Sequence, residues 1–154
     1  MVKPIPDGFH TITPHIVCRD AAKALEFYRE AFGASEIHRA LTPDGKIMHA
    51  AMKIGNSMLM VVDEFPEWKC LGPQSIGGTG VTMHMYVEDA DALYNRAVKA
   101  GAKVTMPIND AFWGDRYGQI QDPFGHSWSI ATHTHDYTPE QMGERMKAQM
   151  ADCG

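Results

Sequence analysis

The segment Thr13-Pro14-His15-Ile16-Val17-Cys18-Arg19-Asp20-Ala21 recurs as Thr82-Met83-His84-Met85-Tyr86-Val87-Glu88-Asp89-Ala90, with Thr, His, Asp and Ala in the same places 69 positions later. Two more pairs of anchors keep this register, Gly33-Ala34 with Gly101-Ala102 and Gly55-x-Ser57 with Gly125-x-Ser127. An offset that stays constant to within one residue indicates a duplicated structural unit. A chain of two similar halves has a natural ligand site where the inner faces of the halves meet.

Each copy of the segment predicts a short strand that ends at an aspartate and leads into a helix. Asp20 and Asp89 are good N-caps, because a short carboxylate accepts hydrogen bonds from the free N–H groups of a helix's first turn. Apolar residues then follow at steps of three and four, and Gly33 and Gly101 end the two helices. Three extended segments follow in each half, about 35–42, 46–54 and 57–63 in the first and about 103–107, 112–121 and 126–132 in the second. We therefore expect a βαβββ unit twice and an α+β fold.

The composition is that of one globular domain. The chain has 154 residues, of which 44% are hydrophobic and 21% charged, as in ordinary soluble proteins. With a net charge of −5 and no run of Lys or Arg, nucleic acid is not an expected partner. No stretch has the length of a membrane span or a signal peptide, and Cys18, Cys70 and Cys153 are scattered like free thiols. We expect a cytoplasmic protein without nucleic-acid or membrane partners.

We expect residues 1–154 to form a single domain with four parts, namely a first module over 10–63, a connecting loop over 64–80, a second module over 81–132 and a tail over 133–154. The connection is long for a loop, so a functional flap and a plain linker are both open. Thr138-Pro139-Glu140-Gln141 is a capping box with Pro at the first helical position, which predicts a helix to about Met150. Its stripe of Met142, Met146 and Met150 should pack on its own domain rather than on a partner subunit.

The second half carries Trp113-Gly114-Asp115-Arg116 followed by Asp122-Pro123-Phe124-Gly125-His126. With two βαβββ units, this order resembles the vicinal oxygen chelate superfamily, which includes glyoxalase I, the bleomycin and fosfomycin resistance proteins and extradiol dioxygenases. The resemblance covers about residues 10–132. Three segments are similar to its PhnB-like branch, namely Gly55-Asn56-Ser57-Met58-Leu59-Met60, His84-Met85-Tyr86-Val87-Glu88-Asp89 and Ala131-Thr132-His133. The resemblance implies two modules whose curved mixed sheets surround one cleft, a small-molecule ligand or substrate, and a homodimer.

Enzymes of that superfamily hold one metal ion in the cleft by His or Glu from the first and last strand of each module. In this sequence, the positions that correspond to those metal ligands are occupied by Thr13, Leu59, Thr82 and Ser129. A neutral hydroxyl binds Zn²⁺, Ni²⁺ or Fe²⁺ poorly and leucine cannot bind them. We therefore expect no cofactor at the usual positions.

Three histidines leave an alternative open. Because strand residues alternate faces, His15 shares a face with Thr13, and His84 shares one with Thr82. If His49 also faces inward, the three could hold a divalent metal ion one pleat away from the usual place. They could also bind an anion when protonated, or simply be hydrogen-bonded residues of the cleft wall.

Aromatic and polar side chains complete the candidate site. Trp113 and Tyr117 could stack on a flat ligand, and Arg116 could bind a carboxylate or phosphonate, or could instead pair with Asp115 or Asp122. The candidate ligand-binding residues are Thr13, His15, His49, His84, Tyr86, Trp113, Arg116, Tyr117 and Ser129. We expect a protein that binds a small molecule between its modules; the alternative is a metal-dependent lyase, isomerase or dioxygenase using His15, His49 and His84. Whether it is an enzyme stays open.

Alternation also predicts which strand residues face the helices. The expected core residues are Ile16, Cys18, Met58, Met60, Val62, Met83, Met85, Val87, Trp128 and Ile130.

Overall fold

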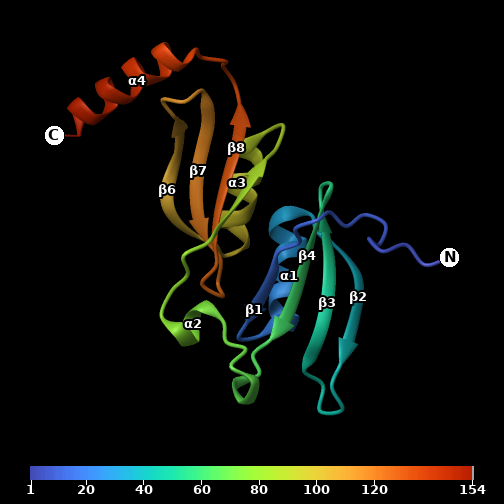
Figure 1. Ribbon diagram of the computed structural model, residues 1–154. Coiled ribbons are helices and arrows are strands. Elements are labelled where there is room, and N and C mark those ends of the chain that lie inside the picture. Colours follow the sequence, from blue (N-terminus) through green and yellow to red (C-terminus); the bar gives the residue numbers. More distant parts are fainter. Residues whose placement is uncertain (154) are drawn as a thin grey trace.

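The computed structural model describes residues 1–153 and contains two βαβββ modules that lie side by side (Figure 1). The first module consists of β1 (His15–Cys18), α1 (Ala21–Phe32), β2 (Ser35–Leu41), β3 (Ile47–Ile54) and β4 (Ser57–Asp63). The second consists of β5 (Thr82–Tyr86), α3 (Ala90–Ala100), β6 (Lys103–Asp110), β7 (Asp115–Gln121) and β8 (Ser127–His133). The expected α+β fold with tandem modules is confirmed.

Each module has its own four-stranded mixed sheet. The strand orders are β1-β4-β3-β2 and β5-β8-β7-β6, so the first strand of each module lies at a sheet edge. The β1–β4 and β5–β8 pairs are parallel and the other pairs are antiparallel. The duplication seen in the sequence is therefore a duplication of sheet topology.

The capping residues act as the sequence indicates. The side chain of Asp20 accepts a hydrogen bond from the N–H of Lys23, and that of Asp89 accepts one from Ala92. Gly33 follows α1 in the left-handed region with φ of 68°, which a residue with a Cβ rarely adopts. Local signals thus place both helices correctly.

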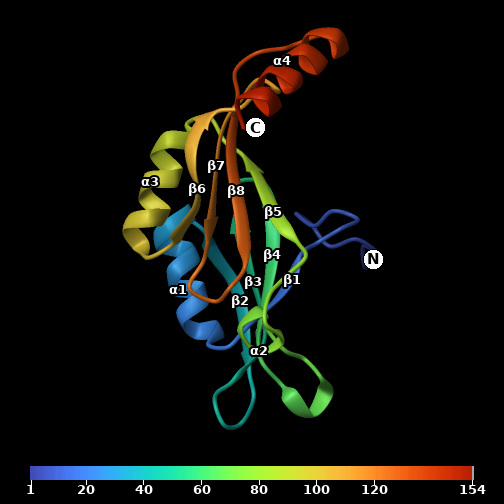
Figure 2. The ribbon, with the colours of Figure 1, turned by 90° about the vertical axis from the view of Figure 1, so that its left-hand side faces the viewer.

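The helices α1 and α3 lie on the same side of the two sheets, and the opposite sheet faces are uncovered (Figure 2). We call the uncovered side of each sheet its open face. The helices α1 and α3 contact each other and, with the covered sheet faces, enclose one continuous core that spans both modules. One core across two modules means that neither module can shift without opening apolar contacts.

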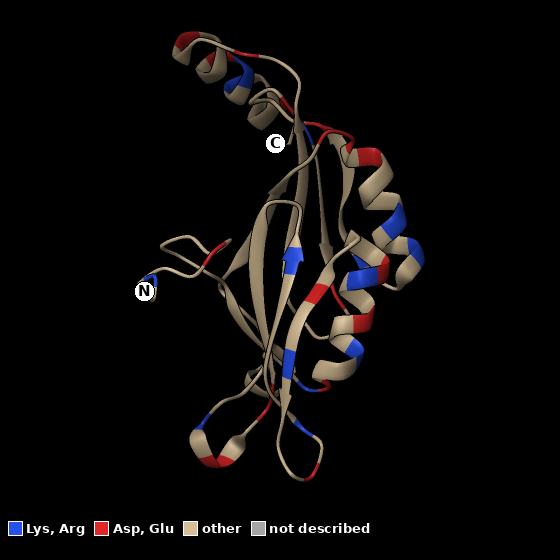
Figure 3. Ribbon diagram, turned by 90° about the vertical axis from the view of Figure 1, so that its right-hand side faces the viewer, with Lys and Arg blue, Asp and Glu red and all other residues tan. Residues whose placement is uncertain are grey.

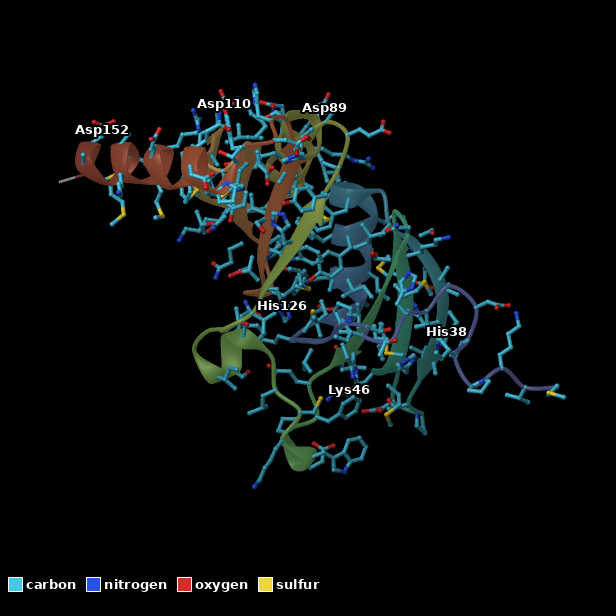
Figure 4. All side chains as sticks on the ribbon, turned by 45° about the horizontal axis from the view of Figure 1, so that its top comes forward. His38, Lys46, Asp89, Asp110, His126 and Asp152 are labelled. Carbon is cyan, nitrogen blue, oxygen red and sulfur yellow. The ribbon has the colours of Figure 1, made fainter. Side chains whose placement is uncertain are left out.

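A buried polar network joins the modules beneath the sheets. The carboxylate of Asp122 accepts hydrogen bonds from the hydroxyl of Tyr28 in α1 and from the indole N–H of Trp128 in β8. His126 donates from Nε2 to the carbonyl of Val17 in β1, 2.9 Å away, and it lies at the junction of the modules (Figure 4). These bonds fix β1 relative to the turn before β8.

The connection over 64–80 is held by hydrogen bonds within itself and to the second module. It contains a 3₁₀ turn (Pro66–Trp68) and the short helix α2 (Pro73–Ile76). Glu64 accepts hydrogen bonds from the N–H of Gly72 and the hydroxyl of Ser75, and Gln74 donates to the carbonyl of Pro123 in the second module. The segment that was expected to be either a flap or a linker is a connector that bridges the modules.

The face assignment of β4 differs from the prediction. Leu59 pairs with Met52 and lies in the core, whereas Met60 pairs with His15 and Ala51 on the open face. Met58, Met60 and Val62 were predicted to face the helix and do not. Met60 and Ser129 are equivalent strand positions, because they pair with His15 and His84. Met60 follows Gly55 by five residues, however, whereas Ser129 follows Gly125 by four, so the two modules differ by one residue here. A one-residue shift moves every side chain to the other face.

The C-terminal helix α4 (Pro139–Asp152) has the predicted capping box but not the predicted packing. It projects away from the second module (Figure 1), and none of its described residues is buried. Met146 and Met150 keep 42% and 67% of their surface exposed. The expectation that the Met stripe packs on its own domain is wrong for a single chain. None of the helices among residues 1–153 is long and apolar enough to cross a membrane.

Candidate functional site

A hollow of about 1060 Å³ lies between the edge strands of the two modules. Its walls are β1 with the segment before it, β5, the turn between β3 and β4, and part of the connection, while Phe32 and Trp128 line it from the core. Within the described chain, β1 and β5 each have a neighbouring strand on one side only, and the hollow lies on the other side. This volume is at the upper end of the range for small-molecule sites.

Four of the predicted site residues line this hollow. Thr13 and His15 come from the first module, and His84 and Tyr86 occupy the corresponding strand of the second. The duplicated Thr-x-His segments therefore lie on opposite walls of one space. The sequence repeat that identified the fold thus has one copy on each wall of the candidate site.

Three further predicted residues lie beside the hollow on the open face of the second module. His84 and Ser129 share a hydrogen bond of 2.6 Å between Nδ1 and Oγ. The ring of Tyr117 stacks against His84 with 5.9 Å between ring centroids, and Trp113 meets Tyr117 edge-on at 4.9 Å. Gln119 donates to the Tyr117 hydroxyl oxygen, so the hydroxyl proton is directed elsewhere. The group combines aromatic surface with free hydrogen-bonding capacity.

The central residue of this group, Asp115, was missed as a site residue. Its side chain is 1% exposed and accepts hydrogen bonds from the Tyr86 hydroxyl (2.9 Å), the Trp113 indole (2.8 Å) and His133 Nδ1 (2.7 Å). Burial raises the pKa of Asp115, but these three hydrogen bonds outweigh it, so the net pKa lies below the usual value. The bond to Asp115 raises the pKa of Tyr86, which keeps its hydroxyl protonated. Asp115 thus holds two aromatic side chains in fixed orientations. Its alternation with Tyr117 along β7 was the signal that could have found it.

Arg116 is not part of this group. Its guanidinium donates to both carboxylate oxygens of Asp91 in α3 (3.1 and 3.0 Å) and lies 3.4 Å from Asp110. As the residue between Asp115 and Tyr117, it points to the covered face of the sheet. The hydrogen bonds to Asp91 raise the pKa of Arg116 and lower that of Asp91. The structure places this predicted anion-binding residue on the wrong side of the sheet, and its partners are neither Asp115 nor Asp122.

His49 faces the open side of the first module but lies outside the lining of the hollow. Its Nδ1 is 2.8 Å from Nε2 of His38, and its ring centroid is 6.3 Å from that of His15. Burial, followed by the neighbouring His38 and His15, lowers the pKa of His49. Within residues 1–153, no three His, Cys, Asp or Glu side chains have an arrangement that could hold a metal ion. The alternative set of His15, His49 and His84 is therefore not assembled within one chain.

The residues at the superfamily's metal positions do not fit a metal ion. The open faces carry Thr13 and Met60 in the first module and Thr82 and Ser129 in the second, with Met60 in place of the predicted Leu59. Two threonines, a serine and a methionine offer neither the imidazole nor the carboxylate that Zn²⁺ or Fe²⁺ prefers. No chemistry through a metal at these positions follows from this chain.

The chain belongs to the glyoxalase/bleomycin resistance protein/dioxygenase superfamily, whose family model matches residues 8–130. An uncharacterized protein of Mycobacterium bovis is 43% identical over 141 residues, covering 90% of this chain and 93% of its own length.

Solved structures share the same fold. The crystal structure of TioX from Micromonospora sp. ML1 superposes with a TM-score of 0.65 at 27% identity, covering 80% of this chain and 98% of TioX. A PhnB protein from Bacillus cereus superposes with a TM-score of 0.63 at 15% identity, covering 80% of this chain and 99% of that protein, and it shares the fold alone.

Proposed function

We propose that this protein binds a small molecule in the hollow between its two modules and uses no metal at the superfamily's usual positions. The observation that carries the proposal is the hollow of about 1060 Å³ between the duplicated strands, with His15 on one wall and His84 on the other. The adjoining group of Tyr86, Trp113 and Tyr117 gives a flat ligand an aromatic surface. Burying apolar ligand area here supplies roughly 25 cal/mol per Å².

The proposal includes membership of the PhnB-like branch. It is supported by the three sequence segments that resemble that branch, around Ser57, Tyr86 and Thr132. Two of these segments contribute to the walls of the hollow.

A thermal-shift screen of aromatic metabolites and antibiotics tests the binding function. A ligand at a hundred times its Kd stabilises the folded state by about 2.7 kcal/mol, which shifts the Tm of a chain of this size by roughly 5–10 °C. Thr82→Trp places a bulky side chain on one wall of the hollow and should reduce the shift. Thr105→Trp makes the same replacement at an exposed position outside the hollow and should keep it. Hits that shift both variants equally would contradict binding in the hollow.

Elemental analysis of protein purified without a His tag or chelators tests the metal part of the proposal. The expected content is well below one equivalent after dialysis against Zn²⁺, Ni²⁺, Mn²⁺ and Fe²⁺. Near-stoichiometric metal that His84→Ala removes would contradict it and would favour a lyase, isomerase or dioxygenase.

We also propose that the protein is a homodimer. Supporting this, α4 and the N-terminal segment extend on the side of the open faces (Figure 2), and Met146 and Met150 of α4 are 42% and 67% exposed. A second copy could cover these groups in a symmetric interface. Light scattering coupled to size exclusion would overturn this proposal if the mass in solution were that of one chain.

A further inference from the structure

Among the described residues that line the hollow, none is Asp, Glu, Lys or Arg. The whole chain is 21% charged, so a lining of this extent would ordinarily include several charged side chains. The lining consists of aliphatic, aromatic, threonine, serine, asparagine and histidine side chains with some glycine and proline. The lining of the hollow therefore lacks these charged residues, although the protein as a whole contains them in ordinary number.

The charged residues lie on the helices, on the loops and on some strands (Figure 3). On the covered side, Arg116 pairs with Asp91, and Arg39 pairs with Glu36. The open face of the first module carries Lys53, which is exposed and outside the lining. Near the hollow, charges are either paired on the other side of a sheet or directed into solvent.

The buried carboxylate of Asp115, beside the hollow, already accepts hydrogen bonds from the protein. Both oxygens of Asp115 are used by three donors, from Tyr86, Trp113 and His133. The Asp115 side chain is only 1% exposed, so a cationic group in the hollow has little access to it. Asp115 therefore does not act as the counter-charge of a ligand.

A charged group that enters a largely apolar site loses hydration, and without an oppositely charged partner no interaction there compensates for this loss. On this ground we infer that the ligand of the hollow is an uncharged, largely apolar molecule that is held by shape and by neutral hydrogen bonds. The inference rests on the proposed binding function and deepens it. Phosphorylated, carboxylated and polycationic compounds should therefore bind weakly when the histidines of the lining are neutral. Neutral donors and acceptors are available from Thr13, Thr82 and His15.

Two fluorescent probes with one skeleton test this inference. N-phenyl-1-naphthylamine is neutral, and 8-anilino-1-naphthalenesulfonate is the same molecule with an added sulfonate. Fluorescence titrations at pH 8, where an ordinary histidine is neutral, should show the neutral probe binding at least tenfold more tightly than the anionic one. The full-length protein is used without modification.

A charge placed in the hollow should reverse this preference. Thr82→Arg puts a cation on the wall at an exposed position that tolerates replacement. It should strengthen binding of the sulfonate probe at least tenfold and weaken binding of the neutral probe. Thr105→Arg makes the same change of net charge on β6, outside the hollow, and should leave both affinities within twofold of the unmodified protein.

The outcomes separate the two claims. If the unmodified protein binds the sulfonate probe as tightly as the neutral one, the inference falls while the binding function stands. If Thr105→Arg changes the affinities as much as Thr82→Arg does, the preference comes from overall charge and the inference also falls. If neither probe binds, the inference of a neutral, largely apolar ligand falls, and the binding function is then decided by the thermal-shift screen.

Discussion

The hydroxyl of Tyr28 in the first module donates a hydrogen bond of 2.5 Å to Oδ2 of Asp122 in the second. The same oxygen accepts from the indole of Trp128, and Oδ1 accepts from the backbone N–H groups of Phe124 and His126. Asp122 is 4% exposed, so these four bonds replace its contacts with water. One carboxylate thus shapes the turn before β8 and ties the two modules together, which keeps both walls of the hollow in place.

Replacing Asp122 by Asn should lower the free energy of unfolding by about 2–4 kcal/mol. Each carboxylate oxygen of Asp122 accepts from two donors. The amide of Asn has only one acceptor oxygen, so its NH₂ group would face two buried N–H or O–H donors. Urea denaturation followed by circular dichroism measures the change. Asp110→Asn is the matched control, since the Asp110 side chain is 82% exposed, and it should cost less than about 1 kcal/mol. An equal effect of the two replacements would show that Asp122 does not join the modules.

Leu59 and Met60 provide a test of the strand register. Leu59 is 3% exposed and lies in the core, whereas Met60 is half-buried on the open face. Leu59→Ala should therefore cost about 2–4 kcal/mol through the cavity it leaves. Met60→Ala should cost roughly 1 kcal/mol or less. The reverse order in denaturation midpoints would indicate that β4 is shifted by one residue.

His133 should titrate above the usual histidine pKa of 6.5. Its ring donates to Asp136 at 2.8 Å and to Asp115 at 2.7 Å, and the bond to Asp136, followed by that to Asp115, raises the pKa. Asp136→Asn should bring the pKa back toward 6.5. Titration of the imidazole protons by NMR, with His133→Gln used to assign the signal, measures it. A value at or below 6.5 in the unmodified protein would contradict the two bonds.

The raised pKa of His133 also predicts a pH dependence of stability. Because the folded-state pKa is higher than the unfolded one, the stabilisation is fully present below about 6.5 and is lost as the pH rises through the raised value. The unmodified protein should therefore be more stable than His133→Gln at pH 6, and the difference should shrink by pH 8. Denaturation midpoints measured across this range test the prediction, and a difference that grows with pH would contradict it.

Removing residues 138–154 should leave the body of the protein almost unchanged. None of the described residues of α4 is buried, and its link to the body is the hydrogen bond from Arg145 to the carbonyl of Phe112 together with the contact of Arg145 on the Tyr137 ring. The Tm should fall by less than about 4 °C. A larger loss at a concentration where the chain is monomeric would show that α4 packs on its own modules.

Local residue patterns predicted the helices and most of the strand bounds correctly. The aspartate caps, the glycines after the helices and the spacing of apolar residues act over one or two turns of chain, so they can be recognised without the fold. The position of the candidate site was predicted from the repeat itself, which placed His15 and His84 on matching strands. Both do line the hollow.

The directions of several side chains could not be predicted in this way. Arg116 was expected near a ligand, but Asp91, 25 residues earlier in the chain, holds it on the covered face. Asp115 is a hydrogen-bond centre only because β5, β8 and the turn before β7 bring its three donors together. Tyr86 and His133 are 29 and 18 residues away from Asp115, and no local pattern encodes such partners.

The sequence by itself determined the duplicated βαβββ topology, because capping, turn formation and amphipathic periodicity are short-range effects that recur at a constant offset. Tertiary structure alone decided which face of β4 lines the core, which charges are paired away from the hollow and where α4 extends. A single residue of difference in turn length reverses the two faces of a strand. The partners of a buried charge are chosen by packing across the whole chain, and this packing leaves the hollow without a charged side chain.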